Sequence, residues 1–489
     1  QNNTYGGGTT ISDGILQLGN GGTTGMIAGN GVNDGALAVN PSDNITFAGD
    51  IGGSGSVAYM GPGTVTLTGN STYTGGTAII GGTVLAGSDS AFGAAGKGLT
   101  IVGGTVQATT SFTMARPITL TTPGGTFDTN GYTLTLQGTI TGSGGLTKQG
   151  TGTLVVESVN TYGGATTINA GTLALSGTGS IAGSSGVALA ASGATFDISG
   201  ASGSQTIQDF AGVAGTSVVL GNNSLTFGTA NSTSFAGSIS GTGGLTKQGS
   251  GTLTLESYGG YSGATTINAG TLAIVGAGGI GSSRLTVASG ATFDISGSGN
   301  TENSVADLAG GGTVRLGSNE LVVGNATGTF SGSIVDAGAG PDGNVTRGAL
   351  TLLEGTLTLS GVSSYGGITR IYQGASLVLI GAGSIADSLY VAFSPSSAGE
   401  ATFDISGTDN GATVGGLLDS SGVGRVVLGS QTLTVTGSSG AFAGSLSGSG
   451  GLALAANAAQ ALAAVNGYTG ATTVGAGATL SLYYDGSIA

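Results

Sequence analysis

The sequence predicts an all-β protein, a right-handed parallel β-helix in which short strands stack coil upon coil. Three observations predict this fold. A block of about one hundred residues recurs along the chain, short runs with a period of two fill each block, and glycine pairs separate the runs. Because a solenoid grows in one dimension, a chain of 489 residues needs no division into compact globular domains.

The repeated block is clearest from Gly144 to Leu175, GGLTKQGTGTLVVESVNTYGGATTINAGTLAL, and it returns from Gly243 to Ile274. One tyrosine marks each copy, and the intervals between successive marking tyrosines are 68, 89, 99, 104 and 103 residues. These are Tyr5, Tyr73, Tyr162, Tyr261, Tyr365 and Tyr468. We expect one continuous domain over 1–489, with superunits at roughly 1–52, 53–143, 144–242, 243–347, 348–449 and, incomplete, 450–489.

The strands are runs of about four or five residues that alternate apolar and polar side chains between glycine corners. Examples are Thr64–Thr68, Thr133–Leu136, Leu285–Val287, Leu321–Val323, Thr356–Leu359 and Thr432–Val435. Sandwiches and propellers also use short strands, but the turns and signatures of hairpins and blades are missing from this sequence. The alanine-rich stretch Leu452–Val465 is expected to be a degenerate strand pair or one helical turn, because it replaces GLTKQGTGTLVVE of other copies.

Composition narrows the possible functions. Hydrophobic residues make up 38% of the chain and charged residues 7%, which predicts a folded protein rather than a disordered one. The net charge of −14, with nine Lys and Arg, argues against binding to nucleic acid or to anionic membranes. No apolar run approaches the roughly 18 residues of a membrane span. The first residue falls inside a repeat, so we expect a processed chain or a fragment.

The motifs resemble the autotransporter-associated β-strand repeats of bacterial type V secretion passengers, the passenger-associated transport repeats. The resemblance covers nearly all of the chain, although the copy at Leu452 lacks the TKQG motif and the fourth superunit carries insertions. The residues that carry it are GLTKxGxGTL at Gly145–Leu154 and Gly244–Leu253, and YxGxTxIxxGTL at Tyr162–Leu173 and Tyr261–Leu272.

The resemblance implies a secreted or surface location outside a Gram-negative outer membrane and a role in adhesion, aggregation or biofilm. It also implies a C-terminal β-barrel translocator in the parent protein, which this sequence lacks.

Catalytic chemistry is restricted because histidine and cysteine are absent. Triads with a histidine base and metal sites built from His or Cys are therefore excluded. Carboxylates recur at Asp128, Asp197, Asp294 and Asp404, within Thr-Phe-Asp motifs, and at Glu157 and Glu256. Equivalent carboxylates lie a superunit apart, roughly 20 Å by the coil spacing, which is too far for a glycosidase pair. We interpret the aspartates as corner-turn residues and expect no enzyme, no cofactor and no metal site.

Two insertions are the candidate binding loops. Gly332 to Gly355 spans 23 residues where Gly237 to Gly251 spans 14, and Leu389 to Thr402 spans 13 where Leu285 to Thr292 spans seven. Insertions in solenoids form loops, often on the binding face. The candidate site residues are Asp336, Asp342, Asn344, Ser394, Ser396 and Glu400. The marking tyrosines are expected to cover corners with their hydroxyl groups in water, or else to form an exposed ladder for glycans.

Three functions compete at this stage. The favoured one is a non-enzymatic extracellular scaffold or adhesin, a passenger stalk whose partner is itself or a host or cell-surface ligand, protein or glycan. The alternative is a self-assembling filament stacked end to end, because both ends of the sequence show open coil edges without caps. A polysaccharide-active β-helix enzyme is the third.

Overall fold

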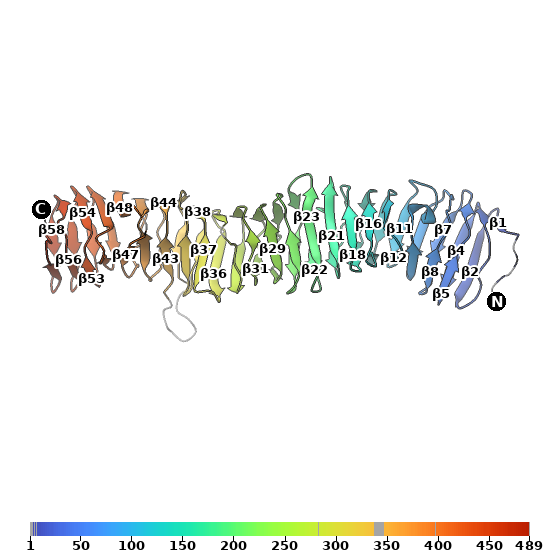
Figure 1. The fold of residues 1–489 in the computed structure, drawn as a ribbon, viewed down its shortest axis with the longest axis horizontal. Helices are drawn as coiled ribbons and strands as arrows, with labels where there is room; N and C mark the ends of the chain where they lie inside the picture. The colour runs from blue at the N-terminus through green and yellow to red at the C-terminus, as the bar shows by residue number, and fades with distance from the viewer. Residues whose placement is uncertain are drawn as a thin grey trace. The chain divides into compact units, whose positions relative to one another are not determined.

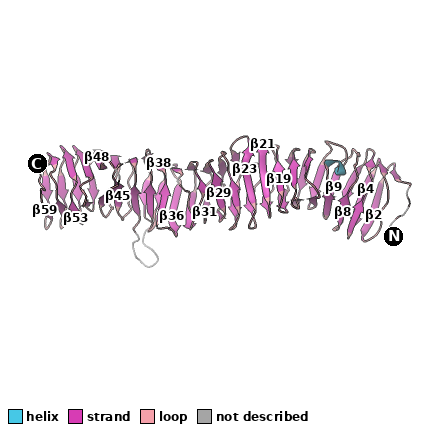
Figure 2. Cartoon of the chain, in the orientation of Figure 1, coloured by secondary structure: helices cyan, strands magenta, loops and turns pink. Residues whose placement is uncertain are grey.

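The computed structural model describes residues 3, 5, 7–281, 283–336, 347–396 and 398–488 of the chain. Its named strands pair in parallel with strands about 20 residues away, as Thr133–Leu136 does with Thr153–Val156. Figure 1 shows successive strands side by side along each part of the chain. Figure 2 shows strands throughout the described residues and one short 3-10 helix, η1 (Asp89–Phe92). The predicted all-β parallel solenoid is therefore confirmed.

The chain forms two compact units, residues 1–228 with 233–243, and residues 229–232 with 244–489. In each unit a coil contributes two or three strands, and strands of successive coils stack into sheets. The six superunit boundaries, and their continuity as one domain, remain predictions.

The strands of the first unit form three long stacks. The first stack contains β5 (Asn44–Phe47), β8 (Thr64–Leu67), β10 (Thr83–Ala86), β12 (Thr105–Ala108), β15 (Gly124–Asp128), β18 (Gly145–Gln149), β20 (Thr166–Ile168), β22 (Gly186–Leu189), β25 (Asp209–Gly212) and β28 (Thr233–Phe235). The second contains β2 (Ile15–Gly22), β4 (Ala36–Pro41), β7 (Ser56–Tyr59), β9 (Thr77–Ile80), β11 (Leu99–Val102), β14 (Ile118–Thr121) and β17 (Ile140–Thr141). The third contains β13 (Phe112–Met114), β16 (Thr133–Leu136), β19 (Thr153–Val156), β21 (Thr172–Gly177), β23 (Thr195–Ala201), β26 (Ser217–Val219) and β29 (Ser238–Gly241). A three-stranded sheet holds β1 (Thr9–Ile11), β3 (Gly31–Asn33) and β6 (Ile51–Gly52), and β24 (Gln205–Thr206) pairs with β27 (Leu225–Phe227).

The strands of the second unit form similar stacks. The longest contains β30 (Leu245–Lys247), β33 (Thr265–Ile267), β35 (Arg284–Val287), β38 (Asp307–Gly310), β41 (Thr329–Phe330), β44 (Gly355–Leu359), β46 (Ala375–Gly381), β48 (Ala401–Thr408), β51 (Gly424–Gly429), β54 (Ser445–Gly448) and β57 (Gly467–Tyr468). Another contains β31 (Thr252–Leu255), β34 (Thr271–Gly276), β36 (Thr292–Ser298), β39 (Thr313–Arg315) and β42 (Ser333–Val335). A six-stranded sheet contains β37 (Glu302–Val305), β40 (Glu320–Val323), β43 (Ala349–Leu352), β45 (Thr369–Tyr372), β47 (Val391–Ser394) and β50 (Leu417–Leu418). The last coils add β49 (Ala412–Val414), β52 (Leu433–Val435), β55 (Leu452–Leu454) and β58 (Thr472–Val474), then β53 (Ser438–Phe442), β56 (Ala459–Leu462) and β59 (Thr479–Leu482), and β32 (Gly260–Tyr261) lies near the start of the unit.

The core of each unit is a set of apolar ladders. Successive residues of a strand point to opposite faces, so every second residue turns into the coil. In the first unit one such ladder has every member buried, and it runs Leu134, Leu154, Leu173, Phe196, Val218 and Ile239 in register. The same alternation produced the sequence prediction, and the predicted strands agree with the observed ones within about one residue at either end. Leu452–Val465 forms the strand pair β55 and β56, so tertiary pairing overrides the helix propensity of alanine.

Candidate functional site

The first insertion is fixed at its base by Asp336, which directly follows β42. One carboxylate oxygen of Asp336 accepts a hydrogen bond from the Gly348 amide at 2.8 Å, and the other accepts one from the Gly366 amide at 2.9 Å. Burial raises the pKa of Asp336, although these two hydrogen bonds oppose the shift. Asp336 therefore closes the base of the loop. The other two candidates in this insertion, Asp342 and Asn344, lie outside the described residues.

The second insertion follows β47, where Ser394 is the last strand residue. The Ser396 amide donates to the side-chain oxygen of Gln373 at 3.1 Å, and Glu400 forms an exposed ion pair with Arg425 at 3.1 Å. These contacts hold the loop against the neighbouring coils.

The inserted residues are distributed differently from the sequence alignment, which compared Leu389 with Leu285. In the structure Val391 pairs with Thr369 as Leu285 pairs with Thr265, so Val391 is the true equivalent. Two of the six extra residues therefore precede β47 and four follow it, because the strand register, and not residue similarity, defines the alignment.

The two insertions lie at opposite edges of the six-stranded sheet of the second unit. The first leads into the start of β43, and the second leaves the end of β47. Strands of a parallel sheet all begin at one edge and end at the other, and a four-residue strand is about 13 Å long. The described candidates, Asp336 at one edge and Ser394 and Ser396 at the other, therefore do not converge on one site, and they share no hydrogen-bond partner.

The repeated aspartates of the Thr-Phe-Asp motifs serve the corners, as predicted. The carboxylates of Asp197, Asp294 and Asp404 each accept a hydrogen bond from the backbone amide two residues later, at 2.8, 2.9 and 2.8 Å. Asp128 does the same with Asn130 at 2.9 Å. This is the Asx turn, in which a side chain replaces a backbone acceptor. The corner-turn interpretation is confirmed.

The marking tyrosines are buried, so the expectation of exposed rings or wet hydroxyl groups is wrong for all of them except Tyr5, which is 45% exposed. The Tyr162 hydroxyl contacts the Thr166 hydroxyl at 2.6 Å, and Thr166 contacts the Ser184 hydroxyl of the next coil at 2.9 Å. The same chain of hydroxyl groups recurs at Tyr261 and Tyr365. The tyrosine is therefore an internal strut. A turn-like sequence cannot reveal that its aromatic ring is buried.

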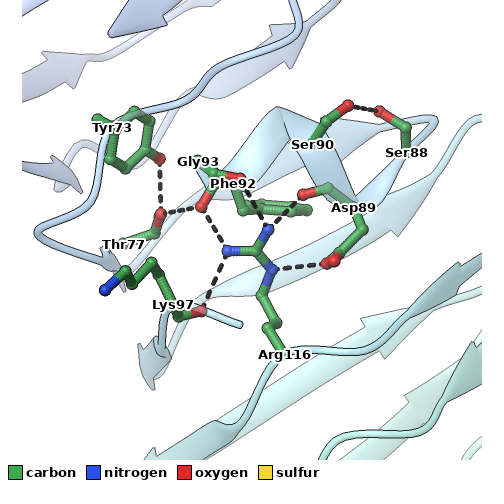
Figure 3. A network of polar contacts seen from close by, with 9 residues as sticks. All are labelled: Tyr73, Thr77, Ser88, Asp89, Ser90, Phe92, Gly93, Lys97 and Arg116. Carbon is green, nitrogen blue, oxygen red and sulfur yellow. Dashed lines mark hydrogen bonds and ion pairs between the residues drawn. The ribbon is translucent and has the colours of Figure 1, made fainter. Parts of the chain in front are cut away.

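Arg116 forms a further buried network, which includes the marking tyrosine Tyr73 (Figure 3). Its guanidinium forms an ion pair with Asp89 at 2.6 Å and donates to the carbonyl oxygens of Phe92, Gly93, Lys97 and Asp89. The Phe92 carbonyl also accepts from Thr77, which contacts the Tyr73 hydroxyl at 2.6 Å. Burial raises the pKa of Tyr73 to about 12. The printed partners of the Arg116 guanidinium all belong to the fold itself, which indicates a structural role.

Lys148, in the most regular repeat, is fully buried although lysine carries a charge. It stands two residues after Leu146, so the period of two turns both side chains inward. Its ammonium group donates to the carbonyl oxygens of Gln149, Gly150 and Ala170 at 2.7, 2.6 and 3.0 Å. Burial lowers the pKa of Lys148 to about 8, partly opposed by the carboxylate of Asp128.

The lowered pKa of Lys148 predicts that stability rises with pH. The unfolded lysine titrates near 10.4, so between pH 8 and that value the unfolded state binds more protons than the folded state. We expect the free energy of unfolding, obtained from urea titration, to be flat below pH 8 and to rise by roughly 1 kcal/mol from pH 8 to 9.5 after solvent screening. Circular dichroism at each pH measures this. The window stops at 9.5 because unfolded tyrosines ionise above it and reverse the trend. In Lys148→Met the rise should shrink, and an unchanged rise would contradict the assignment.

One cleft of about 530 Å³ opens at a corner of the second unit, between Tyr258, Gly278–Gly281 and Gly299–Val305. Sequence reasoning did not identify it, because its lining comes from three successive coils. Within the residues that the structure describes, no three His, Cys, Asp or Glu side chains gather into a metal-binding group. No helix in that same part of the chain is long and apolar enough to cross a membrane.

Comparison with known proteins identifies the repeat. The passenger-associated-transport-repeat family matches residues 1–18, 60–86, 146–175, 245–274 and 354–379. A relative, the "Adhesin BmaC autotransporter" of Brucella suis biovar 1 (strain 1330), is 43% identical over 143 residues, which is 29% of this chain and 4% of that protein. The match thus spans a small part of the relative's length. No solved structure matches the chain significantly. Five segments of the chain thus match passenger-associated transport repeats, and the chain resembles autotransporter passengers, as predicted.

Proposed function

We propose that this chain is a non-enzymatic, stalk-like region of an autotransporter adhesin passenger that mediates attachment at a bacterial surface. The observation that carries the proposal is the fivefold match to passenger-associated transport repeats, each on the strands of a parallel solenoid. The adhesin name of the Brucella suis relative supports it. The location that these repeats imply is the cell exterior, secreted or on the outer side of the outer membrane.

The chemistry of the repeats supports a scaffold. Within the described residues, the polar side chains that define each repeat form hydrogen bonds inside the fold. Asp197 accepts one at a corner, the Tyr162 hydroxyl bonds Thr166, and the Lys148 ammonium donates to backbone carbonyls. Groups engaged in this way are not free to bind a partner. Binding is therefore assigned to the places where the repeat is interrupted, which include the insertion after Asp336.

A loop deletion tests the adhesive role. Removing residues 337–344 while retaining Asp336 is expected to reduce attachment of expressing cells to host cells several-fold. Asp336 must be kept because it bonds the Gly348 and Gly366 amides, so the coil should stay folded, with an unchanged circular dichroism spectrum. A second deletion, of residues 395–398 from the other candidate loop, shows which of the two insertions makes the contact.

If attachment were equal in both deletion variants and in the parent, the loop after Asp336 would not be the binding contact. Attachment absent from the parent chain itself would contradict the adhesive role. End-to-end filament formation and a biofilm role stay predictions, and electron microscopy of the purified chain distinguishes fibres from single rods. Turnover of a polysaccharide that depends on one carboxylate would support the enzyme alternative instead.

A further inference from the structure

At one corner of the second unit, two residues that contact each other both differ from their equivalents at three other corners of the chain. These three are called the sister corners below. In three superunits an exposed valine forms a bridge with a serine in the next coil: Val159 with Ser180, Val362 with Ser384, and Val465 with Ser487. At the corner that precedes Tyr261, Tyr258 forms the same bridge with Gly279. Both members of the pair have changed together, from a branched aliphatic and a small polar residue to an aromatic ring and a glycine.

The geometry explains why the two changes belong together. A Cβ atom on Gly279 would lie 2.9 Å from Cδ2 of Tyr258 and 3.4 Å from Cε2, so the ring rests on the glycine backbone. A serine at this position, as in the sister corners, would push the ring away. Gly279 thus supports Tyr258 from below, while the tyrosine stays 59% exposed. This arrangement presents an aromatic surface to solvent.

The cleft of about 530 Å³ lies beside this ring. Neighbouring positions have also lost side chains, because Gly259 and Gly281 replace Asn160 and Ala182 of the preceding superunit. Polar groups from the next coil form the rim, where Thr301, Glu302 and Ser304 are exposed. The volume falls within the roughly 300–1,000 Å³ that is usual for small-ligand sites.

The rim of the cleft is held in place and carries negative charge. The Asn300 amide group donates to the Gly278 carbonyl at 3.1 Å, which connects the rim to the coil below. Glu302 pairs in register with Glu320 on β40. Glu320 is partly neutralised by Arg370 at 3.4 Å and by a hydrogen bond from Thr351, which leaves Glu302 as the carboxylate that lines the cleft.

We propose that this corner, the Tyr258 corner, is a binding site for neutral oligosaccharides. A sugar ring has an apolar C–H face, which stacks on an exposed aromatic ring, and a rim of hydroxyl groups that need both donors and acceptors. Tyr258 supplies the surface, the hydroxyl groups of Thr301 and Ser304 supply donors and acceptors, and the carboxylate of Glu302 accepts. The same carboxylate disfavours acidic sugars by charge repulsion. The proposal deepens the adhesive role by naming a ligand class, and it rests on that role for its biological setting.

The position of the Tyr258 corner agrees with a binding role. The rim residues lead into the start of β37, and the first insertion leads into the start of β43 in the same parallel sheet. Only β40 separates these two strands. The cleft therefore opens at the sheet edge where the repeat is interrupted, not at the opposite edge that holds the second insertion.

The test is direct binding of purified protein to an array of neutral and acidic oligosaccharides, followed by titration calorimetry with the best neutral one. The double variant Tyr258→Val, Gly279→Ser restores the pair found in the sister corners, so it should fold. We expect its affinity to fall at least tenfold. Gly279→Ser alone should also weaken binding, because it displaces the ring without removing it. The matched control, Tyr132→Val, replaces a tyrosine that is 40% exposed elsewhere in the chain and should bind normally.

A second variant tests the charge argument independently of folding. Glu302→Gln should retain neutral sugars and bind acidic ones more readily than the parent. Failure of the parent to bind any saccharide, or equal binding by the double variant, would overturn the proposal. Attachment to host cells is measured in parallel. If the double variant still attaches, the adhesin function stands and the sugar site is not its contact. If the parent chain does not attach, the adhesin function itself is contradicted.

Discussion

Replacement of Arg116 with alanine should destabilise the coils around η1 by about 3–5 kcal/mol, because the carboxylate of Asp89 and three carbonyl groups lose this donor, while the Phe92 carbonyl keeps only its bond from Thr77. The Arg116 side chain is 0% exposed, and that of Asp89 is 20% exposed. Both charged groups lose water when the corner forms. Their contact at 2.6 Å offsets this desolvation cost only while both are present. Hydrogen exchange with mass spectrometry should show protection lost from residue 89 to residue 118.

Arg425→Ala is the matched control. Arg425 forms its ion pair with Glu400 at 3.1 Å, with side chains 46% and 62% exposed, and surface pairs of this kind contribute about 0–1 kcal/mol. Its exchange pattern should resemble that of the parent chain. If both variants lost the same protection, burial would not explain how the Arg116–Asp89 ion pair contributes to stability. Local exchange is the right measure because a solenoid can open locally without unfolding as a whole.

Phe196→Ala should cost about 3–5 kcal/mol, the usual range for removing a buried aromatic ring. Phe196 is fully buried in the ladder of the first unit, between Leu173 and Val218. Neighbouring rungs belong to different coils and cannot collapse inward without breaking their own pairing, so the cavity stays open. A fall in the urea midpoint, with earlier loss of exchange protection in β21 and β26 than elsewhere, is the expected result.

The adjacent residue supplies the control for this prediction. Asp197 points outward and accepts one hydrogen bond from the Ser199 amide at 2.8 Å, so Asp197→Ala should cost only about 0.5–1.5 kcal/mol. A larger effect from Asp197 than from Phe196 would mean that the corner, and not the ladder, holds the coil together. The pair thus separates the two roles that a single Thr-Phe-Asp motif combines.

The proposals agree on one physical picture of the molecule. Regular coils use their polar side chains internally, as Tyr162 and Lys148 show, and this leaves recognition to irregular positions. The Tyr258 corner is irregular by substitution, and the segment after Asp336 is irregular by length. Two kinds of departure from one repeat therefore produce two candidate contacts along one sheet edge.

The amino-acid sequence by itself determined the architecture. Alternation in runs such as Thr133–Leu136 predicted the strands, the recurrence of the block predicted stacked coils, and the Thr-Phe-Asp motif predicted the corner turn. These features are local or strictly periodic, so they depend on a residue and its near neighbours. The same periodicity places Lys148 inside the coil despite its charge.

Only the tertiary structure decided what meets across coils. Arg116 finds Asp89 27 residues away, Tyr258 rests on Gly279 in the next coil, and the two insertions separate to opposite edges of one sheet. Each of these outcomes depends on the register between strands about 20 residues apart. Register is a property of the whole stack, because it is fixed by the summed packing of the apolar ladders and not by any short stretch of sequence.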